Sequence, residues 1–328
     1  MGARRWTVGV DFGATNIKIG IVNGQGRVVC EAKRSTREHT TPATFVEGLS
    51  NAVMQLSAQL GLGLPRLRGI GVGAPGLIDA HRGLIHQLVN VPGGWRNVPL
   101  RQLLEEEFRC PCAVDNDVNV VALGEWRFGA GRGSRHSVYI TLGTGVGGGL
   151  VINGKLVRGV TGSAGEIGHT IVQPNGPRCT CGKRGCLEAL VGTAALRNRA
   201  RQAIREGDRL LSALAKHENG FVTPELLSQA AQAGDRAAIQ IWQEVGCALG
   251  LGLSNVVNLL NPERIVIGGG IAKAWPWFVA SLRATIHQQA FELPAKACRI
   301  VRAQLGDRAG IVGAAVLIWE QQVKGVRY

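Results

Sequence analysis

Short apolar runs, each closed by a glycine-rich or polar turn, recur along the chain and predict β-strands. These runs lie at residues 6–10, 17–22, 27–30, 68–72, 113–114, 137–142, 150–152 and 264–267. Longer segments carry apolar residues three or four positions apart, which predicts amphipathic helices. They lie at residues 42–60, 118–128, 193–206, 224–233, 235–260 and 309–322, with a further helix after Pro276. Strands that alternate with helices predict an α/β fold of packed layers.

The opening pattern of strand, glycine turn, strand and Asn-Gly turn returns after an offset of 130 residues. Four positions correspond at this offset: Asp11, Gly13, Asn23 and Gly24 fall on Thr141, Gly143, Asn153 and Gly154. We interpret the recurrence as an internal duplication. A length of 328 residues also suits two domains. We expect a small α/β domain at residues 1–120 and a larger one at 121–308, with a C-terminal helix at about 309–328 packing back on the first domain.

Three glycine-rich turns follow predicted strands, at residues 11–16, 143–149 and 268–270. Backbone N–H groups in such turns form concavities that bind anions. The 143–149 turn formally fits the dinucleotide-binding fingerprint, but that motif must open a helix, and here a strand follows. The sequence also lacks a P-loop. We therefore predict a phosphate cradle made of two hairpin turns that face each other.

Side chains of the first two turns offer ligands of their own. Asp11 suits a Mg²⁺ ion, usually through water, because Mg²⁺ keeps much of its hydration shell. Thr15, Asn16 and Thr144 can donate hydrogen bonds to phosphate oxygens. The alternative is that these segments are plain hairpin turns without a ligand.

One histidine and three closely spaced cysteines form a second chemical pattern. His169 precedes Cys179, Cys181 and Cys186. Zn²⁺ takes four nitrogen or sulfur ligands at tetrahedral corners, and a Cys₃His set leaves no open position for water. We therefore predict a structural zinc site rather than a hydrolytic one. The alternative is a set of ordinary core cysteines, but the loop is rich in Pro, Gly and Arg, so we expect little burial there.

Three carboxylates are candidates for binding a hydroxyl group of a ligand or accepting its proton. Asp117 closes the run Asp115-Asn116-Asp117 between a predicted strand and a predicted helix. A carboxylate there can accept the proton of a hydroxyl group whose oxygen attacks phosphorus; the alternative is simple helix capping. Glu166 and Glu188 flank the predicted zinc loop. That loop could hold them as rigid acceptors for ligand hydroxyls, or they are ordinary surface carboxylates.

The chain is basic, with 37 Lys and Arg against 23 Asp and Glu and a net charge of +14. Such a charge attracts polyanions, but the basic residues are dispersed, and only Arg132, Arg135 and His136 cluster tightly. We therefore expect no nucleic-acid partner. No apolar run reaches the ~18 residues of a membrane span, and the N-terminus lacks the apolar core of a signal peptide. We expect a cytoplasmic protein with no membrane partner.

Taken in order, these motifs resemble those of the ROK family (repressors, open reading frames and kinases), and in particular its bacterial glucokinases. The resemblance runs the length of the chain and rests on residues 11–18, 73–79, 94–100, 115–119, 142–148, 165–169, 179–186 and 267–270. It implies an actin-like ATPase fold, which is a duplicated ribonuclease-H-like α/β fold whose two domains flank a cleft. It also implies ATP-dependent phosphoryl transfer to a hexose hydroxyl, with glucose to glucose 6-phosphate as the expected reaction.

The resemblance also assigns a role to each motif. Asp117 would be the general base, and the sugar would contact Gly76, Asn116, Asp117, Glu166, His169 and Glu188. ATP and Mg²⁺ would be held by Asp11, Gly13, Thr15, Asn16, Lys18, Gly143, Thr144 and Gly145, while Gly269 and Gly270 would face the nucleoside. Structural Zn²⁺ would be bound by His169, Cys179, Cys181 and Cys186. His169 would then use one ring nitrogen for the metal and the other for the sugar. The family further suggests a homodimer or homotetramer.

Two departures from the family pattern leave alternatives open. Ala14 replaces a glycine that is commoner in the first loop, and an additional glycine precedes Trp95, which would reshape the loop on the sugar side. The acceptor could therefore be N-acetylglucosamine, mannose, allose or fructose, and the basic charge is compatible with polyphosphate as the donor. A third alternative is a sugar-sensing repressor. Those family members carry an N-terminal helix-turn-helix, and a first strand at about residue 6 leaves no room for one.

Overall fold

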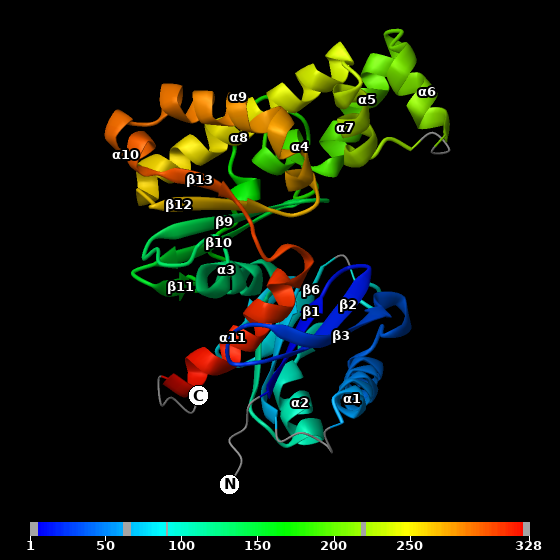
Figure 1. Ribbon diagram of the computed structural model, residues 1–328, viewed down its shortest axis with the longest axis vertical. Helices are drawn as coiled ribbons and strands as arrows, with labels where there is room; N and C mark the ends of the chain where they lie inside the picture. Colours follow the sequence, from blue (N-terminus) through cyan, green and yellow to red (C-terminus); the bar gives the residue numbers. More distant parts are fainter. Residues whose placement is uncertain (1–5, 62–66, 90, 218–220, 324–328) are drawn as a thin grey trace. The chain divides into compact units, whose positions relative to one another are not determined.

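The computed structural model describes residues 6–61, 67–89, 91–217 and 221–323. Within them the strands form two five-stranded sheets and one three-stranded sheet, with helices packed against them (Figure 1). The chain divides into two compact units: Met1–Ser134, Gly149–Ala164 and Gln304–Tyr328 form the first, and Arg135–Gly148 and Gly165–Ala303 form the second. The boundary expected after residue 120 falls inside a helix that stays whole in the first unit, because it packs on the C-terminal helix. Residues 324–328 of the expected C-terminal helix lie outside the described residues.

The first unit contains a sheet in the order β3-β2-β1-β4-β8. Its strands are β1 (Trp6–Phe12), β2 (Asn16–Val22), β3 (Val28–Ser35), β4 (Leu67–Ala74) and β8 (Cys112–Asn116). The first three strands are antiparallel, whereas β4 runs parallel to β1 and to β8. A small antiparallel meander is inserted between β4 and β8, with strands β5 (Gly76–Asp79), β6 (Leu84–Leu88) and β7 (Arg96–Val98).

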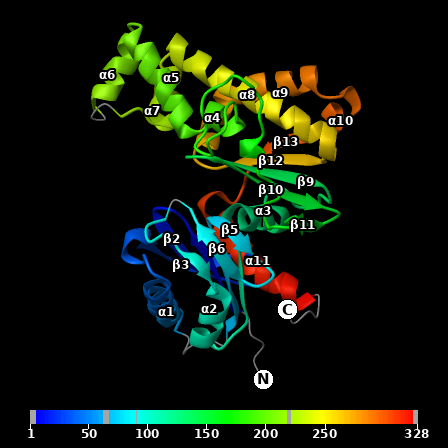
Figure 2. The same cartoon turned by 180° about the vertical axis from the view of Figure 1, so that it is seen from behind.

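Helices cover both faces of this first sheet. They are α1 (Pro42–Gln59), α2 (Leu100–Phe108), α3 (Asp117–Phe128) and α11 (Ala309–Val323). Successive side chains of a strand point to opposite faces, so Val8 and Val10 join a core with Phe45 of α1, while Gly9 faces α11. A Cβ atom at Gly9 would lie only 1.9 Å from the carbonyl oxygen of Ile311, so the glycine lets α11 lie directly on the sheet. Figure 1 shows α11 along the sheet, and Figure 2 shows α1 and α2.

The second sheet has the order β11-β10-β9-β12-β13. Its strands are β9 (Ser137–Leu142), β10 (Val146–Ile152), β11 (Lys155–Val157), β12 (Arg264–Gly268) and β13 (Arg299–Arg302), and the boundary between the units runs through β10. The helices of this half are α4 (Leu187–Val191), α5 (Thr193–Arg205), α6 (Arg209–His217), α7 (Pro224–Gln232), α8 (Arg236–Leu260), α9 (Trp275–Gln289) and α10 (Glu292–Ala297).

Helix α8 is the central element of the second unit. Its N-cap, Asp235, accepts a hydrogen bond from the Ala238 N–H at 2.8 Å, which satisfies one of the free donors at the start of the helix. It contacts α9, α4, α5, α7 and α10. Trp242 of α8 and Phe278 of α9 are both fully buried, with ring centroids 6.4 Å apart. The 235–260 helix is therefore predicted correctly, because its apolar stripe is long and its cap is a favoured residue.

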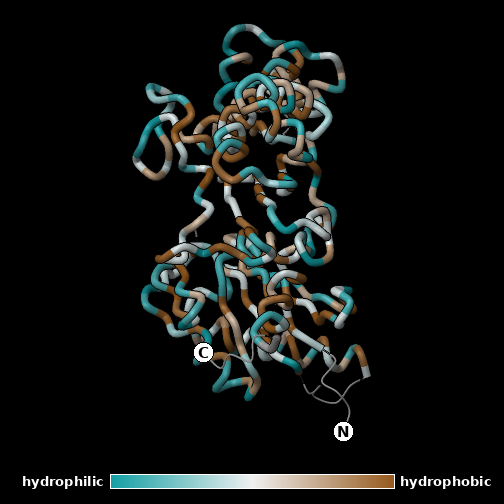
Figure 3. Tube along the Cα trace, turned by 90° about the vertical axis from the view of Figure 1, so that its left-hand side faces the viewer, coloured by the Kyte–Doolittle hydropathy of each residue, from teal (hydrophilic) through white to brown (hydrophobic). Residues whose placement is uncertain are grey.

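The two five-stranded sheets have the same strand order, position by position. Corresponding strand pairs are also alike, since β1 runs parallel to β4 as β9 does to β12, and β4 runs parallel to β8 as β12 does to β13. This repetition confirms the predicted duplicated α/β fold. Figure 3 follows the alternation of hydrophobic and hydrophilic residues along the chain. Within the described part of the chain, no helix combines the length and the apolarity that crossing a bilayer requires.

Candidate active site

The first glycine turn joins β1 to β2 and places a charged pair at its base. The Gly13 N–H donates to the Asn16 carbonyl at 3.0 Å, which closes the turn. Asp11 Oδ2 and Lys18 Nζ, on the paired strands, lie 3.8 Å apart. Burial raises the pKa of the Asp11 carboxyl above its ordinary value of 3.8, and the Lys18 ammonium offsets part of that rise. The turn thus presents backbone donors, a carboxylate and an ammonium together, and Thr15 beside them is exposed.

A second loop of the first unit brings Gly76 next to Asn116. Gly76 opens β5 with a φ of +113°, a conformation that favours glycine. A Cβ atom there would lie 2.2 Å from the Gln87 carbonyl oxygen, so only glycine fits. The Asn116 side chain donates from Nδ2 to the Gly76 carbonyl oxygen at 3.3 Å. Two residues predicted to bind sugar, 40 positions apart in the sequence, are therefore in contact.

Asn116 and Asp117 stand where β8 ends and α3 begins. Asn116 is the N-cap of α3, and its Oδ1 accepts hydrogen bonds from the N–H groups of Val118 at 2.9 Å and Asn119 at 3.3 Å. Asp117 is the first residue of the helix and is half-buried, and its Oδ1 also accepts from the Val118 N–H at 2.9 Å. Capping is thus performed mainly by Asn116, which accepts from two backbone N–H groups.

Asp115, the residue before this pair, is engaged in a way that sequence reasoning missed. Its side chain is buried, and Arg158 donates from Nε to Asp115 Oδ2 at 2.7 Å, while Arg158 Nη2 forms an ion pair with the same oxygen at 2.7 Å. The partner comes from 43 residues further along the chain. No spacing rule connects the two positions, although an Asp inside a predicted buried strand is by itself a sign of a required partner.

The loop with the additional glycine is anchored by its tryptophan. Trp95 is buried, its Nε1 donates to the Thr40 carbonyl oxygen at 2.7 Å, and its ring packs on Phe12 and Phe45. A Cβ atom at Gly93 would lie 2.0 Å from the same Thr40 oxygen. Trp95 therefore belongs to the core behind β1, and this core holds the end of the strand that carries Asp11.

The second glycine turn joins β9 to β10 in the second unit. The Gly143 N–H donates to the Gly145 carbonyl at 3.0 Å, and Thr193 donates to the Gly143 carbonyl from its N–H at 3.0 Å and from its hydroxyl at 2.9 Å. Thr144 at the tip is exposed. The chain continues as β10, so the prediction of a hairpin rather than a helix-opening fingerprint is confirmed.

Glu188 connects this turn to the loop that carries Cys179, Cys181 and Cys186, which we call the cysteine loop. Its Oε2 accepts from the Val146 N–H at 3.1 Å, and its Oε1 accepts from the Thr180 hydroxyl at 2.9 Å and lies 3.5 Å from Cys179 Sγ. The residue sits at the start of α4 and is half-buried. The prediction that the cysteine loop anchors Glu188 is supported by these contacts.

His169, Cys179, Cys181 and Cys186 form one cluster, whose ligand atoms all lie within 4.8 Å of one another. The Sγ atoms of Cys181 and Cys186 are 3.7 Å apart, and His169 Nδ1 lies 3.7 Å from Cys179 Sγ. Two Zn–S bonds at the tetrahedral angle place their sulfur atoms ~3.8 Å apart. The donor set, its spacing and its closed geometry therefore fit a structural Zn²⁺.

The cysteine loop is more buried than expected. Cys179 and Cys186 are buried, and only Cys181 is exposed. The loop folds back on itself, with the Gly185 N–H donating to the Pro177 carbonyl and the Cys179 N–H donating to the Lys183 carbonyl. Burial raises the pKa of the Cys179 thiol and raises that of Cys186 to about 12, whereas a backbone N–H at Lys183 lowers the pKa of Cys181. Thiolates buried in this way need a cation close by.

The other predicted residues of the second unit are distributed over two loops. Glu166 is exposed, and its Oε2 lies 3.9 Å from Nε2 of His169, the ring nitrogen that does not face Cys179. Gly269 and Gly270 follow β12, and their carbonyl groups accept from the N–H groups of Ala272 and Lys273 in a short 3₁₀ turn. Glu166 and His169 thus lie together beside the cluster, and the 269–270 turn is a separate feature at the end of β12.

Glu125 is a further polar residue that the sequence did not single out. It lies in α3 and is fully buried. Its two carboxylate oxygens accept from the backbone N–H groups of Ala130, Gln304 and Leu305 at distances of 2.7–3.1 Å. The carboxylate thus joins α3 to the segment that leads into α11.

The residues match one protein family along almost the whole chain. The family model described as "ROK family" matches residues 7–321. A glucokinase of Halalkalibacterium halodurans is 38% identical over 321 residues, which cover 97% of this chain and 96% of the relative. A glucokinase of Thermotoga maritima is 34% identical over 314 residues, covering 96% and 97%. Among solved structures, a ROK family glucokinase from Streptomyces griseus in complex with glucose and AMPPNP is 34% identical with a TM-score of 0.81, covering 96% of this chain and 99% of that one.

Proposed function

Because this chain belongs to the ROK family, we propose that it is a sugar kinase that transfers the γ-phosphoryl group of ATP to glucose, with Asp117 as the general base. The full-length similarity to bacterial glucokinases supports this activity. So does the similarity to a structure that contains glucose and an ATP analogue. The observation that carries the role of Asp117 is its place in the first turn of α3, beside an asparagine that already caps the helix and binds Gly76.

The proposed step transfers one phosphoryl group and one proton. The 6-hydroxyl oxygen of glucose forms a bond to the γ-phosphorus of ATP while its proton passes to the Asp117 carboxylate. The bond between the γ-phosphorus and the bridging oxygen breaks, so that ADP leaves with the electron pair and glucose 6-phosphate remains. A positioned base contributes typically ~10²–10⁴-fold to such a step. Positioning and charge neutralisation supply most of the rest.

Each unit contains residues that we propose as contacts of the sugar. Gly76 and Asn116 are in contact in the first unit. In the second, Glu166 and His169 lie together, and Glu188 is anchored by Thr180 and Val146. Carboxylates can accept hydrogen bonds from sugar hydroxyls, and the Nε2–H of a histidine that binds zinc through Nδ1 can donate one to a sugar oxygen. Rigid support of such acceptors matters because small displacements of a bound substrate cost much of the rate.

Three turns would hold the nucleotide. Residues 11–16 and 143–145 present backbone N–H groups to phosphate oxygens, and Gly269 and Gly270 would face the nucleoside. Asp11 and Lys18 are placed at the base of the first turn. Asp11 would hold Mg²⁺ through water, and the ion would neutralise phosphate charge when bound.

We also propose that His169, Cys179, Cys181 and Cys186 bind a structural zinc ion. The distances between the donor atoms support this site. The histidine would bind through Nδ1, which faces Cys179, and Nε2 would stay available to a sugar hydroxyl. Assembly as a homodimer or homotetramer is a separate proposal that light scattering can test.

The test is a coupled assay of the wild type and of Asp117→Asn with glucose, N-acetylglucosamine, mannose, allose and fructose, each with ATP and with polyphosphate. We expect glucose with ATP to be the preferred pair. Asp117→Asn should lower kcat by ~10²–10⁴-fold, while glucose binding, measured by calorimetry, changes little. Asp235→Asn is the matched control, because Asp235 caps a helix in the second unit and has no proposed role in the reaction. An Asp117→Asn enzyme with kcat within about threefold of wild type, as in the control, would refute the base.

A further inference from the structure

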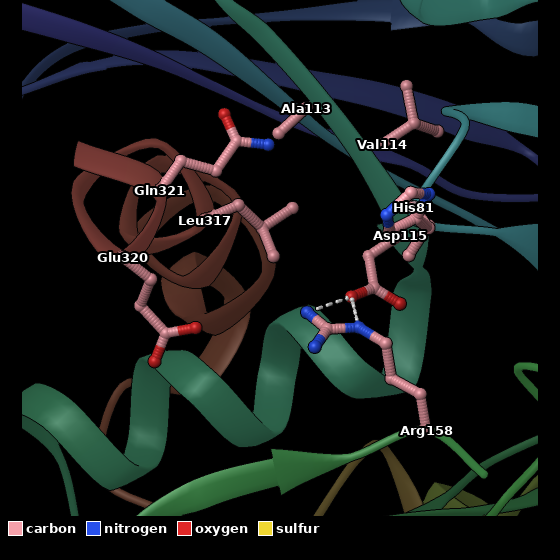
Figure 4. Close-up of a pocket in the computed structure, with 9 residues that line it drawn as sticks. His81, Ala113, Val114, Asp115, Arg158, Leu317, Glu320 and Gln321 are labelled. Carbon is pink, nitrogen blue, oxygen red and sulfur yellow. Dashed lines mark hydrogen bonds and ion pairs between the residues drawn. The ribbon is translucent and has the colours of Figure 1, made fainter. Parts of the chain in front are cut away.

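Asp115, two residues before the proposed base Asp117, forms a buried ion pair with Arg158. Asp115 is 2% exposed, and the hydrogen bond from Arg158 Nε and the ion-pair contact of Arg158 Nη2 converge on its Oδ2 atom (Figure 4). An ionised carboxylate buried without a partner is strongly disfavoured. The Arg158 guanidinium supplies the partner of this buried carboxylate.

The other oxygen of Asp115 accepts hydrogen bonds where β8 ends and α3 begins. Its Oδ1 accepts from the Asn116 N–H at 2.7 Å and from Nδ2 of Asn119 at 2.9 Å. Hydrogen bonds to an ionised acceptor are shorter and stronger than those to a neutral one. One carboxylate therefore ties Arg158 to the backbone at the junction of β8 and α3 and to the first turn of α3.

The orientation of two proposed site residues depends on that junction. Asn116 uses its Oδ1 to cap α3 and its Nδ2 to bind the Gly76 carbonyl oxygen. Asp117 shares the Val118 N–H with Asn116. A rotation of the Asn116 peptide would therefore move both side chains. The Asp115 carboxylate resists this rotation, because it accepts the N–H of that same peptide.

Arg158 comes from a loop that is itself fixed in the first unit. The loop follows β11, and the Ala164 N–H donates to the Arg158 carbonyl at 2.9 Å. Gly162 packs on β5, where a Cβ atom would lie 2.4 Å from the Ile78 carbonyl oxygen. The guanidinium is therefore delivered to Asp115 by a loop that packs against the strand opened by Gly76.

The far side of the ion pair faces a cavity of about 170 Å³. Its lining includes His81, Leu317, Glu320 and Gln321 in addition to the pair, and Figure 4 shows these side chains around the guanidinium. Side chains do not fill the space on this side, so packing alone does not fix the guanidinium. The guanidinium is held instead by its hydrogen bond and its ion pair with Asp115.

We infer that Arg158 is a positioning residue for phosphoryl transfer: through Asp115, it holds Asn116 and Asp117 in the orientation that the reaction needs. The inference rests on the proposed role of Asp117 as the base. The competing account is that the ion pair only stabilises the fold. The two accounts differ in what happens to kcat in protein that remains folded.

The experiment compares Arg158→Met, Arg158→Lys, Asp115→Asn and the double variant Arg158→Met/Asp115→Asn with wild type. Arg158→Met should lower kcat about 10–100-fold, because a base displaced by a fraction of an ångström loses much of its effect, while KM for ATP stays within about twofold. Arg158→Lys keeps the charge and should be intermediate. The double variant should recover at least about fivefold over Arg158→Met, because it removes the unpaired buried carboxylate. Arg27→Met, at an exposed arginine between β2 and β3 with no proposed role in the reaction, is the control and should behave as wild type.

Thermal melts and Asp117→Asn are measured in parallel to separate the possible failures. A folded Arg158→Met enzyme with wild-type kcat would overturn the inference, whether or not its melting temperature falls. The proposed base would still stand if Asp117→Asn is inactive in the same assay. Turnover by Asp117→Asn would instead overturn the proposed base. Should Arg158→Met not fold, Asp115→Asn decides: a severalfold loss of kcat with unchanged KM for ATP supports the inference, and wild-type kcat overturns it.

Discussion

Strand β1 has Asp11 next to its last residue, whereas its counterpart β9 has Thr141 at the matching position. The match is structural as well as sequential: Asp11 pairs with Gly73 of β4, and Thr141 pairs with Gly268 of β12 in the same parallel arrangement. Asp11 faces the ammonium of Lys18. The second turn, residues 143–149, contains no charged side chain. The same hairpin thus offers charge in the first unit and mainly backbone groups in the second.

The two units also hold their polar side chains by different means. In the first, buried carboxylates are paired within the fold, Asp115 with Arg158 and Glu125 with backbone N–H groups. In the second, the supports come from the cysteine loop, which contacts Glu188 and contains the neighbour of His169. A duplicated sheet therefore supplies equivalent positions, and the chemistry depends on a few substitutions and on one inserted loop.

Loss of the proposed zinc ion should have the largest effect, because the ion would hold together His169, Cys179, Cys181 and Cys186 in the second unit. Cys186→Ser, or treatment with a strong chelator, should remove the zinc. For small zinc domains the metal contributes about 10–16 kcal/mol of apparent folding energy. We expect metal content to fall from about one equivalent per chain to near zero and glucose phosphorylation to be lost.

Metal analysis and a thermal melt check this prediction. Cys247→Ser is the control, because Cys247 is an exposed cysteine of α8 outside the cluster. A zinc-free protein with full activity would show that the cluster does not support the proposed sugar residues. An unchanged melting temperature in Cys186→Ser would show that the loop folds without metal.

The matched pair Asp11 and Thr141 tests whether the difference in charge is functional. Asp11→Asn should lower kcat by about 10²-fold, since electrostatic stabilisation of transferred phosphate depends on such groups. Thr141→Val should change kcat by less than about threefold, because this hydroxyl carries no charge. Steady-state kinetics at varied Mg²⁺ check both, and only Asp11→Asn should shift the Mg²⁺ dependence. Equal losses in the two variants would mean that the hairpins are functionally alike.

Glu125 tests the carboxylate supports of the first unit. Glu125→Gln replaces one acceptor oxygen with an N–H₂ group that faces backbone donors, so at least one buried N–H loses its partner. The expected cost is about 2–3 kcal/mol in the free energy of unfolding. Denaturant titration measures it, with the exposed Glu107→Gln as the control. A loss below about 0.5 kcal/mol would indicate that the three backbone N–H groups find other partners.

The sequence predicts the parts of this molecule that depend on local or repeated patterns. The 42–60 and 235–260 helices have periodic apolar residues and favoured caps, Thr41 and Asp235, and both form with ends within a residue or two of the prediction. The repeated glycine hairpins indicated the duplication, and the cysteine spacing indicated the cluster. Each of these features is a pattern within a short segment, and the duplication is one such pattern that returns 130 residues later.

What depends on contacts between distant segments could not be predicted. Arg158 reaches Asp115 across 43 positions, and Glu125 binds the N–H of Leu305 across 180. The short strands β5, β6, β7, β11 and β13 were missed because three to five residues carry too little periodicity. The burial of Cys179 was also missed, because the loop buries it by backbone hydrogen bonds rather than by apolar composition.

The smallest predicted effect concerns the stability cost of the Asp11 charge. Burial raises the Asp11 pKa above 3.8, so the folded state binds this proton more tightly than the unfolded chain does. Stability therefore falls as the pH rises from 3.8 through the raised pKa, and at pH 7 the ionised carboxylate destabilises the free protein. In buffer without metal or nucleotide, Asp11→Asn should melt about 1–3 °C above wild type at pH 7. The difference should shrink as the pH is lowered toward 4, and Thr141→Val should show no such trend. If Asp11→Asn melted below wild type at pH 7, the Lys18 ion pair would outweigh burial, and the charge in the first hairpin would stabilise the fold.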